Sequence, residues 1–268
     1  MIFKLLFALL LFSSLNAKEE KSLEKVSLQL QWLDQFQFAG YYMAKEKGFY
    51  RDVGLEVELK KFDYALNPID EVLSRRATYG IGRSSLIIDA DKGKKIKLLS
   101  AIFQSSPLVY IAIQESNIRT IKDFKGRRVM LTTDTSLSVD IHAMLNQAHL
   151  EINDIQEIEH TFNIQDLIDN RTDLMASYIS NEPFLLEQRG IKSVIFDPKD
   201  YGFNFYSDII FTTADEVQSN KRRTINFQNA SLKGWAYAFS HIEESVDLIL
   251  KKYNAQNKSR EALIYEPK

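Results

Sequence analysis

The chain has 268 residues, of which 45% are hydrophobic, 12% are aromatic and 26% are charged. These proportions are typical of a globular protein, and they exclude a disordered, collagen-like or coiled-coil chain. The 34 basic and 36 acidic residues give a net charge of -2, so we expect neither nucleic acid nor an anionic membrane as a partner. Cysteine is absent, which excludes disulfides, thiolate catalysis and iron–sulfur clusters.

The amino terminus has the layout of a secretory signal peptide. Lys4 is followed by the short apolar run 5–12, and small and polar residues then lead to Ala17, after which we expect cleavage. The apolar run is too short to remain as a membrane anchor. We therefore expect residues 1–17 to be a signal peptide and, since cysteine is absent, the mature protein to be periplasmic.

Strand and helix patterns alternate along the first part of the mature chain. Residues 26–32 alternate between apolar and polar side chains, which is typical of a half-buried strand. Similar strand signals follow at 55–59, 79–82, 96–103 and 108–113, and helical signals at 40–47, 68–76 and 86–90. Because helices separate most of these strands, we expect parallel strand pairing and an α/β fold.

A second unit of the same kind begins near Glu115. We expect its strands at 129–131, 155–158, 174–178 and 193–196, and its helical segments at 118–124, 134–148, 164–170 and 181–189. The β-branched run 209–212 then returns to the first unit, followed by helices at 234–239 and 245–253. The predicted organisation is one lobe of residues 18–113 and 209–268 and a second of residues 114–208, with a ligand cleft between them.

Several motifs resemble one family of periplasmic solute-binding proteins, those related to thiamine-pyrimidine and sulfonate binders. The similar segments are 30–32, 40–50, 54–55, 118–129, 178–184, 201–203 and 230–238. The resemblance implies a type II periplasmic-binding-protein fold, with two α/β lobes and a hinged central cleft. It also implies a monomer that captures a small aromatic or pyrimidine-like solute, of the thiamine-precursor type, for the membrane component of an ABC transporter. Relatives carry further helical sequence after Tyr253, so we expect a shortened first lobe.

Two other functions fit related proteins. The segments 178–184 and 234–237 also resemble the sensory input domains of membrane histidine kinases and diguanylate cyclases, although no membrane span or output module follows in this chain. The pyrimidine synthase of thiamine biosynthesis needs a Schiff-base lysine, a donor histidine and a cysteine-rich iron motif. The corresponding segment 79–86 contains neither a lysine nor a histidine, so we expect no enzyme activity and no cofactor.

Aromatic rings are concentrated just after the first predicted strand. Ligand clefts of parallel α/β sheets lie beyond the carboxyl ends of the strands, so Trp32, Phe38 and Tyr41 are candidates to sandwich a flat heterocycle. The alternative is that Phe36, Phe38 and Tyr42 fill the core beneath the first helix. Trp32 could belong to the core as well, because strand alternation places it on the same face as the apolar residues 28 and 30. Pyrimidine binders of the resembled family often have a histidine where this chain has Phe38.

Hydroxyl side chains mark two strand-to-helix turns, one in each predicted lobe. Ser84 and Ser85 could bind a polar or anionic group with the free amides of a helix start, or they could only cap that helix. Thr133, Thr135 and Ser136 belong to a run of five polar, cap-forming residues, more than one helix cap requires. We expect both turns to face the ligand.

A third turn combines Tyr178, Asn181 and Glu182. An amide and a carboxylate can pair with the ring nitrogens or the exocyclic amine of an aminopyrimidine. Glu182 can equally be a first-turn carboxylate that the helix dipole favours, and the proline at position 183 supports that structural role. We expect no metal site, because the four histidines are scattered: His142, His149, His160 and His241.

Overall fold

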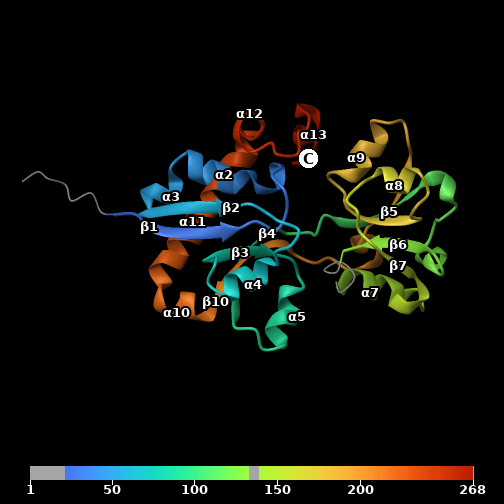
Figure 1. The fold of residues 1–268 in the computed structure, drawn as a ribbon, viewed down its shortest axis with the longest axis horizontal. Coiled ribbons are helices and arrows are strands. Elements are labelled where there is room, and N and C mark those ends of the chain that lie inside the picture. Colours follow the sequence, from blue (N-terminus) through green and yellow to red (C-terminus); the bar gives the residue numbers. More distant parts are fainter. Residues whose placement is uncertain (1–21, 133–138, 268) are drawn as a thin grey trace, which may run out of the picture.

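The computed structural model describes residues 22–132 and 139–267, which form two α/β lobes joined side by side (Figure 1). The expected signal peptide, residues 1–17, lies outside the described residues, as do the candidate site residues Thr133, Thr135 and Ser136. Within the described ranges, no helix is both long enough and apolar enough to cross a bilayer.

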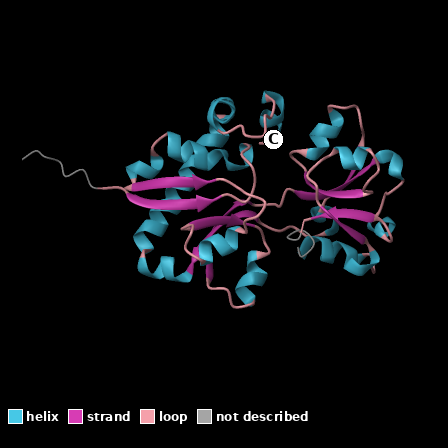
Figure 2. Ribbon diagram, in the orientation of Figure 1, coloured by secondary structure: helices cyan, strands magenta, loops and turns pink. Residues whose placement is uncertain are grey.

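The first lobe contains a five-stranded sheet with the order β2-β1-β3-β10-β4. Its strands are β1 (Glu24–Gln29), β2 (Leu55–Lys60), β3 (Tyr79–Gly82), β4 (Ile96–Phe103) and β10 (Ser207–Thr213). Its helices are the 3-10 turn η1 (Phe36–Phe38), α2 (Ala39–Glu46), α3 (Phe49–Asp52), α4 (Pro68–Leu73), α5 (Leu86–Asp91), α10 (Ala214–Ser219), α11 (Lys221–Ser240), α12 (Ile242–Lys252) and α13 (Arg260–Tyr265). Helices cover both faces of the sheet (Figure 2).

The second lobe contains a five-stranded sheet with the order β7-β6-β8-β5-β9. Its strands are β5 (Leu108–Ile113), β6 (Arg128–Leu131), β7 (Gln156–Glu159), β8 (Leu174–Tyr178) and β9 (Ser193–Phe196). Its helices are α7 (Val139–Gln147), α8 (Gln165–Ile168) and α9 (Glu182–Glu187), with 3-10 turns η2 (Gln114–Ser116), η3 (Ile121–Phe124), η4 (Ile152–Asp154) and η5 (Pro198–Tyr201).

The expectation of purely parallel sheets is wrong for one strand of each lobe. β10 runs antiparallel to β3 and β4, and β5 runs antiparallel to β8 and β9. Both are the first strands after the chain passes from one lobe to the other. The preceding parallel strand ends at the edge that faces the partner lobe, so the chain enters the next lobe at that edge and must run away from it.

The same observation corrects the expected boundary between the lobes. We placed residues 108–113 in the first lobe, but β5 belongs to the second sheet, so the chain crosses at residues 104–107. The return crossing precedes β10, and the two crossings are bonded to each other. The Ser106 amide donates to the Phe205 carbonyl at 2.7 Å, and the Ser105 hydroxyl donates to the Asn204 side chain at 2.6 Å. This bonded pair of segments, residues 104–107 and 203–206, connects the two lobes.

In the first lobe, α2 packs directly against α11 at a glycine contact. A Cβ on Gly234 would lie 2.1 Å from the Gly40 carbonyl oxygen, and a Cβ on Gly40 would lie 2.2 Å from the Trp235 ring. Both distances are far below van der Waals contact, so this close approach requires glycine on both helices. The contact fixes the helix that follows Trp32 against the lobe core.

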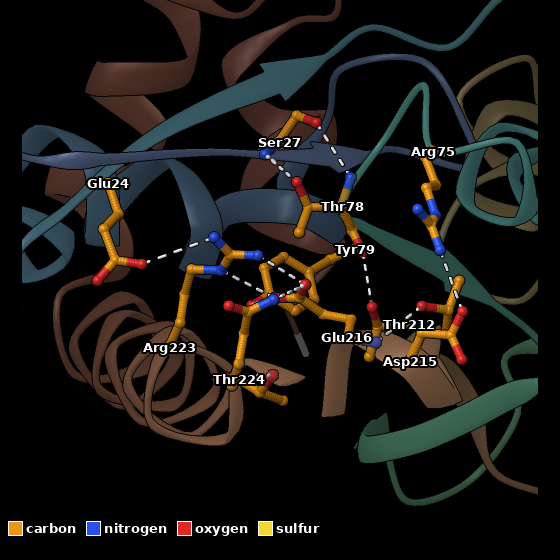
Figure 3. A network of polar contacts seen from close by, with 12 residues as sticks. Glu24, Ser27, Arg75, Thr78, Tyr79, Thr212, Asp215, Glu216, Arg223 and Thr224 are labelled. Carbon is orange, nitrogen blue, oxygen red and sulfur yellow. Dashed lines mark hydrogen bonds and ion pairs between the residues drawn. The ribbon is translucent and has the colours of Figure 1, made fainter. Parts of the chain in front are cut away.

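A polar network ties the sheet of the first lobe to α10 and α11 (Figure 3). Arg223 donates to both carboxylate oxygens of Glu216, at 2.8 and 2.6 Å, and the Tyr79 hydroxyl donates to the same carboxylate at 3.2 Å. The Thr212 hydroxyl donates to the Thr78 carbonyl at 2.7 Å, which joins β10 to the start of β3. These residues do not line the cavity between the lobes, so the network stabilises the fold.

Candidate functional site

A cavity lies between the lobes, and residues of both lobes line it; its empty space, including the part that is open to solvent, is about 510 Å³. The first lobe contributes Trp32, Gln35, Gln37 and Arg83, and the second contributes Leu108, Thr132, His160, Phe162, Ala176, Ser177, Tyr178, Asn181 and Glu182. Several of these residues follow the carboxyl ends of β1, β3, β6 and β8, which is where parallel α/β sheets place their ligand sites.

Aromatic rings from the two lobes meet at this cavity. Trp32 follows β1, is half-buried, and lies 4.7 Å between ring centroids from Phe162 of the second lobe. Within its own lobe, Trp32 contacts Phe62 at 5.2 Å and Tyr64 at 6.0 Å. The interplanar angle between Trp32 and Phe162 is 57°, so the two rings touch without stacking in parallel.

The loop that carries Phe162 is held by His160. The Phe162 amide donates to His160 Nδ1 at 2.9 Å, and His160 Nε2 lies 2.8 Å from the Ala176 carbonyl. A carbonyl only accepts, so Nε2 carries a proton. Nδ1 accepts from an amide and therefore carries none, so the imidazole is neutral. Burial lowers the pKa of His160, which favours the same neutral form. Phe162 has a φ of 59°, a left-handed conformation that is strained for a bulky side chain and that the hydrogen bond to His160 supports.

Arg83 reaches from the first lobe to the second. Its Nε donates to the Tyr178 hydroxyl at 3.1 Å, and its guanidinium lies 5.7 Å from the centroid of the same ring. Burial raises the pKa of Tyr178, so the phenol remains protonated at neutral pH. The pair places a positive charge and a hydroxyl at one side of the cavity.

Glu182 and Asn181 add a carboxyl group and an amide to the wall that the second lobe forms. Glu182 Oε2 accepts from the Tyr178 amide at 2.9 Å, and Glu182 Oε1 accepts from the Asn181 amide group at 2.6 Å. Burial raises the pKa of Glu182. The first residue of α9 therefore presents a carboxyl group that is fixed by two hydrogen bonds inside the cavity wall.

Buried amides form the wall of the first lobe. Gln35 donates to the Gln37 side-chain oxygen at 2.7 Å, and Gln37 donates to Asp208 Oδ1 at 2.8 Å. Asp208 is the second residue of β10 and has a φ of 48°, and the Ser207 hydroxyl donates to its other oxygen at 3.2 Å. Burial raises the pKa of Asp208 to about 6. The cavity wall is thereby connected to the strand that enters the first lobe from the second.

The structure places the predicted site residues unevenly around this cavity. Trp32, Tyr178, Asn181 and Glu182 line it, as their positions at or just after strand ends suggested. Phe38 and Tyr41 do not: both are fully buried in the core of the first lobe, and Tyr41 packs edge-on against Trp235 at 5.6 Å. Core packing, which was the alternative for Phe38, therefore describes both rings, and the expectation that Phe38 and Tyr41 face the ligand is wrong.

The hydroxyl residues that we expected at the ligand lie largely away from the cavity or outside the described residues. Ser84 and Ser85 lie at the turn before α5 but do not line the cavity; their neighbour Arg83 does. Of the polar run that begins at Thr132, only Thr132 itself is described, and it lines the cavity.

Sequence analysis missed several lining residues, of which Arg83, His160 and Phe162 matter most. Arg83 directly precedes the serines of a turn that we singled out, so its position was available from the sequence. His160 and Phe162 lie in an irregular loop after β7, and no periodic pattern indicates where that loop points. Among the described residues, no group of three or more histidine, aspartate or glutamate side chains is placed to hold a metal ion.

Comparison with known proteins places the chain in a family. Residues 35–245 match the family model described as "NMT1/THI5 like". The riboflavin-binding protein RibY of Chloroflexus aurantiacus is 26% identical over 243 residues, which cover 87% of this chain and 67% of that protein. The formylaminopyrimidine-binding protein of Halalkalibacterium halodurans is 22% identical over 267 residues, which cover 96% of this chain and 80% of that protein.

Solved structures share the fold. The periplasmic aliphatic sulphonate binding protein SsuA from Escherichia coli aligns with a TM-score of 0.69 over 90% of this chain and 77% of that chain, at 16% identity. This likeness confirms the predicted periplasmic-binding-protein fold of two α/β lobes. Because the family model matches well over half of its residues, the chain belongs to the NMT1/THI5-like family.

Proposed function

We propose that the protein is a periplasmic receptor that closes its two lobes on a small aromatic heterocycle and presents it to the membrane component of an ABC transporter. The observation that carries this proposal is the pair of rings from different lobes, Trp32 and Phe162, at one cavity. Export to the periplasm rests on the sequence pattern of residues 1–17.

The distance between the two rings argues for a moving cleft. A planar ring held between two others needs a contact of ~3.5–4 Å on each face, or about 7 Å in all. Trp32 and Phe162 are 4.7 Å apart, so the lobes must open by a few ångströms to admit such a ligand. The paired crossings near Ser106 and Phe205 provide the connection about which the lobes can turn.

The polar groups around the rings favour a heterocycle over a simple hydrocarbon. Gln35 and Gln37 supply amides from the first lobe, while Asn181 and Glu182 supply an amide and a carboxyl group from the second. Heterocycle nitrogens and exocyclic amines or carbonyls match such groups, and fixed hydrogen bonds give the orientation that stacking lacks. The two sequence relatives named above are, by name, binders of riboflavin and of a formylaminopyrimidine, and both ligands are heteroaromatic.

Isothermal titration calorimetry with three ligands tests the proposal. Formylaminopyrimidine and riboflavin represent heteroaromatic ligands of different size, and an aliphatic sulfonate represents ligands without a ring. We expect saturable binding of at least one heterocycle and none of the sulfonate.

A matched variant links the binding to the site. Phe162→Leu keeps an apolar side chain but removes the ring, so the affinity for the heterocycle should fall about threefold to tenfold, the worth of one aromatic pair. Leu232→Ala, on an exposed part of α11, is the control and should bind like the wild type. Binding of the sulfonate alone, or an affinity that Phe162→Leu leaves unchanged, would contradict the proposal.

A further inference from the structure

The segment 254–266 follows α12 and belongs to the first lobe, yet it extends to the second. Leu263 of α13 is fully buried in the core of the first lobe. Gln256 donates to the Asp34 carbonyl at 2.9 Å and lies 3.4 Å from the Gln35 side-chain oxygen, so the segment also supports the cavity wall of the first lobe. In Figure 1, α13 lies at the end of the first lobe that is nearest to α9 of the second.

Lys258 connects this segment to the second lobe. Its ammonium group donates to Glu266 Oε1 and to Asn181 Oδ1, at 2.6 Å each. The side chains of Lys258 and Glu266 are only 9% and 4% exposed, so the charge pair is withdrawn from water at the junction of the lobes. Asn181 in turn donates to Glu182 at 2.6 Å. A continuous line of hydrogen bonds therefore runs from a lysine of the first lobe to a carboxyl group in the cavity.

A second contact lies beside the first. The rings of Tyr265 in α13 and Phe184 in α9 are stacked, with centroids 4.7 Å apart and planes inclined by 29°. Asn181 is the residue that precedes α9, and Phe184 belongs to its first turn. The segment therefore holds one end of α9 by a charged hydrogen bond and by a ring stack.

We propose that residues 254–266 form a latch that holds the two lobes closed, and that Lys258 is the positioning residue that couples closure to Asn181 and Glu182 in the cavity. If the lobes separate, Lys258 keeps Glu266, which lies in its own lobe segment, but loses Asn181. A buried ion pair adds little net stability, but it favours the one arrangement in which all of its hydrogen bonds are made. The latch itself needs no ligand; only its effect on affinity rests on the proposed function.

The absence of cysteine from the chain allows a direct test, because two introduced cysteines carry the only spin labels. Lys251→Cys in α12 and Glu187→Cys in α9 place one exposed label on each lobe. Double electron–electron resonance measures the distance between the two labels. We expect this distance to be short in the ligand-free protein, because the latch holds the lobes closed. Lys258→Met should lengthen the distance and lower the ratio of closed to open molecules about tenfold, as expected for one charged hydrogen bond.

Two further variants isolate the contact between the lobes. Lys252→Met removes an equal charge whose partner, Glu46, lies in the same lobe, and it should leave the distance unchanged. Tyr265→Leu removes the ring stack and keeps the buried ion pair, so it should shift the distance in the same direction by a smaller, severalfold change in the ratio. Tyr265→Leu carries the test if Lys258→Met does not fold.

The outcomes separate the latch from the proposed function. Lengthened distances with Lys258→Met and Tyr265→Leu, but not with Lys252→Met, support the latch even if none of the three ligands binds. Wild-type distances in folded Lys258→Met and Tyr265→Leu proteins overturn it, whatever the ligand. For a ligand that does bind, Lys258→Met should also weaken affinity about tenfold while Lys252→Met does not, and equal affinities would overturn the positioning role.

Discussion

Replacement of Trp32 by alanine should affect ligand binding more than folding. Trp32 is half-buried, and two of its three ring partners, Phe62 and Tyr64, lie in its own lobe. Each aromatic pair is worth ~0.5–1.5 kcal/mol, so the two pairs within the lobe contribute about 1–3 kcal/mol to the loss of unfolding free energy, in addition to the apolar area of a ring that is only half-buried. A ligand that stacks on Trp32 loses its ring contact and its buried area, on the order of 2 kcal/mol or about thirtyfold in Kd.

The second tryptophan of the chain is a natural control. Trp235 is 4% exposed and packs against Tyr41 and Gly40 in the core of the first lobe. Trp235→Ala should cost ~3–5 kcal/mol of unfolding free energy, because it leaves a cavity in a packed core. Urea unfolding followed by circular dichroism and calorimetric titration on the same samples separate the two effects. A Trp32→Ala protein that is as unstable as Trp235→Ala and binds its ligand with unchanged affinity would refute the placement of Trp32 in the ligand site.

Two other substitutions test the electrostatics of the cavity wall and the packing of the first lobe. Burial raises the pKa of Asp208 from 3.8 to about 6. The native protein therefore binds a proton that the unfolded chain releases, and the contribution of Asp208 to the free energy of unfolding should fall by about 2 kcal/mol between pH 4 and pH 7. Asp208→Asn should remove this fall in urea unfolding at the two pH values, whereas the exposed Asp215→Asn should retain it. Gly234→Ala places a methyl group 2.1 Å from the Gly40 carbonyl and should destabilise the protein by ~1–3 kcal/mol or more; an unchanged melting temperature would contradict the close contact of α2 and α11.

Much of the fold follows from local sequence patterns. The strands predicted at 96–103, 108–113, 174–178 and 193–196 have the same ends in the structure, because each is a largely apolar run between turn residues. The direction of β5 and β10 was not predictable in this way. Strand direction depends on which edge of the sheet the chain enters, and that is decided by the passage between lobes rather than by side chains.

The candidate site was predictable only where a side chain lies at or just after a strand end. Trp32, Asn181 and Glu182 follow a strand end, Tyr178 is the last residue of β8, and all four line the cavity. Phe38 lies six residues after Trp32 and directly before α2, and it is buried in the core of the first lobe. The identity of an aromatic residue does not distinguish the core from a cavity. Phe162 comes from a loop whose conformation rests on a strained residue.

Long-range partners were beyond local patterns altogether. Gln256 contacts Gln35, and Lys258 contacts Asn181, across separations of 221 and 77 residues. Such contacts form only when the two lobes and the last helix are assembled, and neither residue belongs to a motif. The sequence therefore predicts the two lobes and part of the cavity lining. It does not predict that the segment 254–266 contacts both walls of the cavity.

The most direct measurement of the proposed site uses Trp32 as its own reporter. The chain contains two tryptophans, so Trp235→Phe leaves Trp32 as the only one, at the cavity and 4.7 Å from Phe162. Titration of this variant with formylaminopyrimidine and with riboflavin should give a saturable change in Trp32 fluorescence, with the same midpoint that calorimetry gives. Saturable binding by calorimetry without any change in Trp32 fluorescence would show that the ligand binds elsewhere.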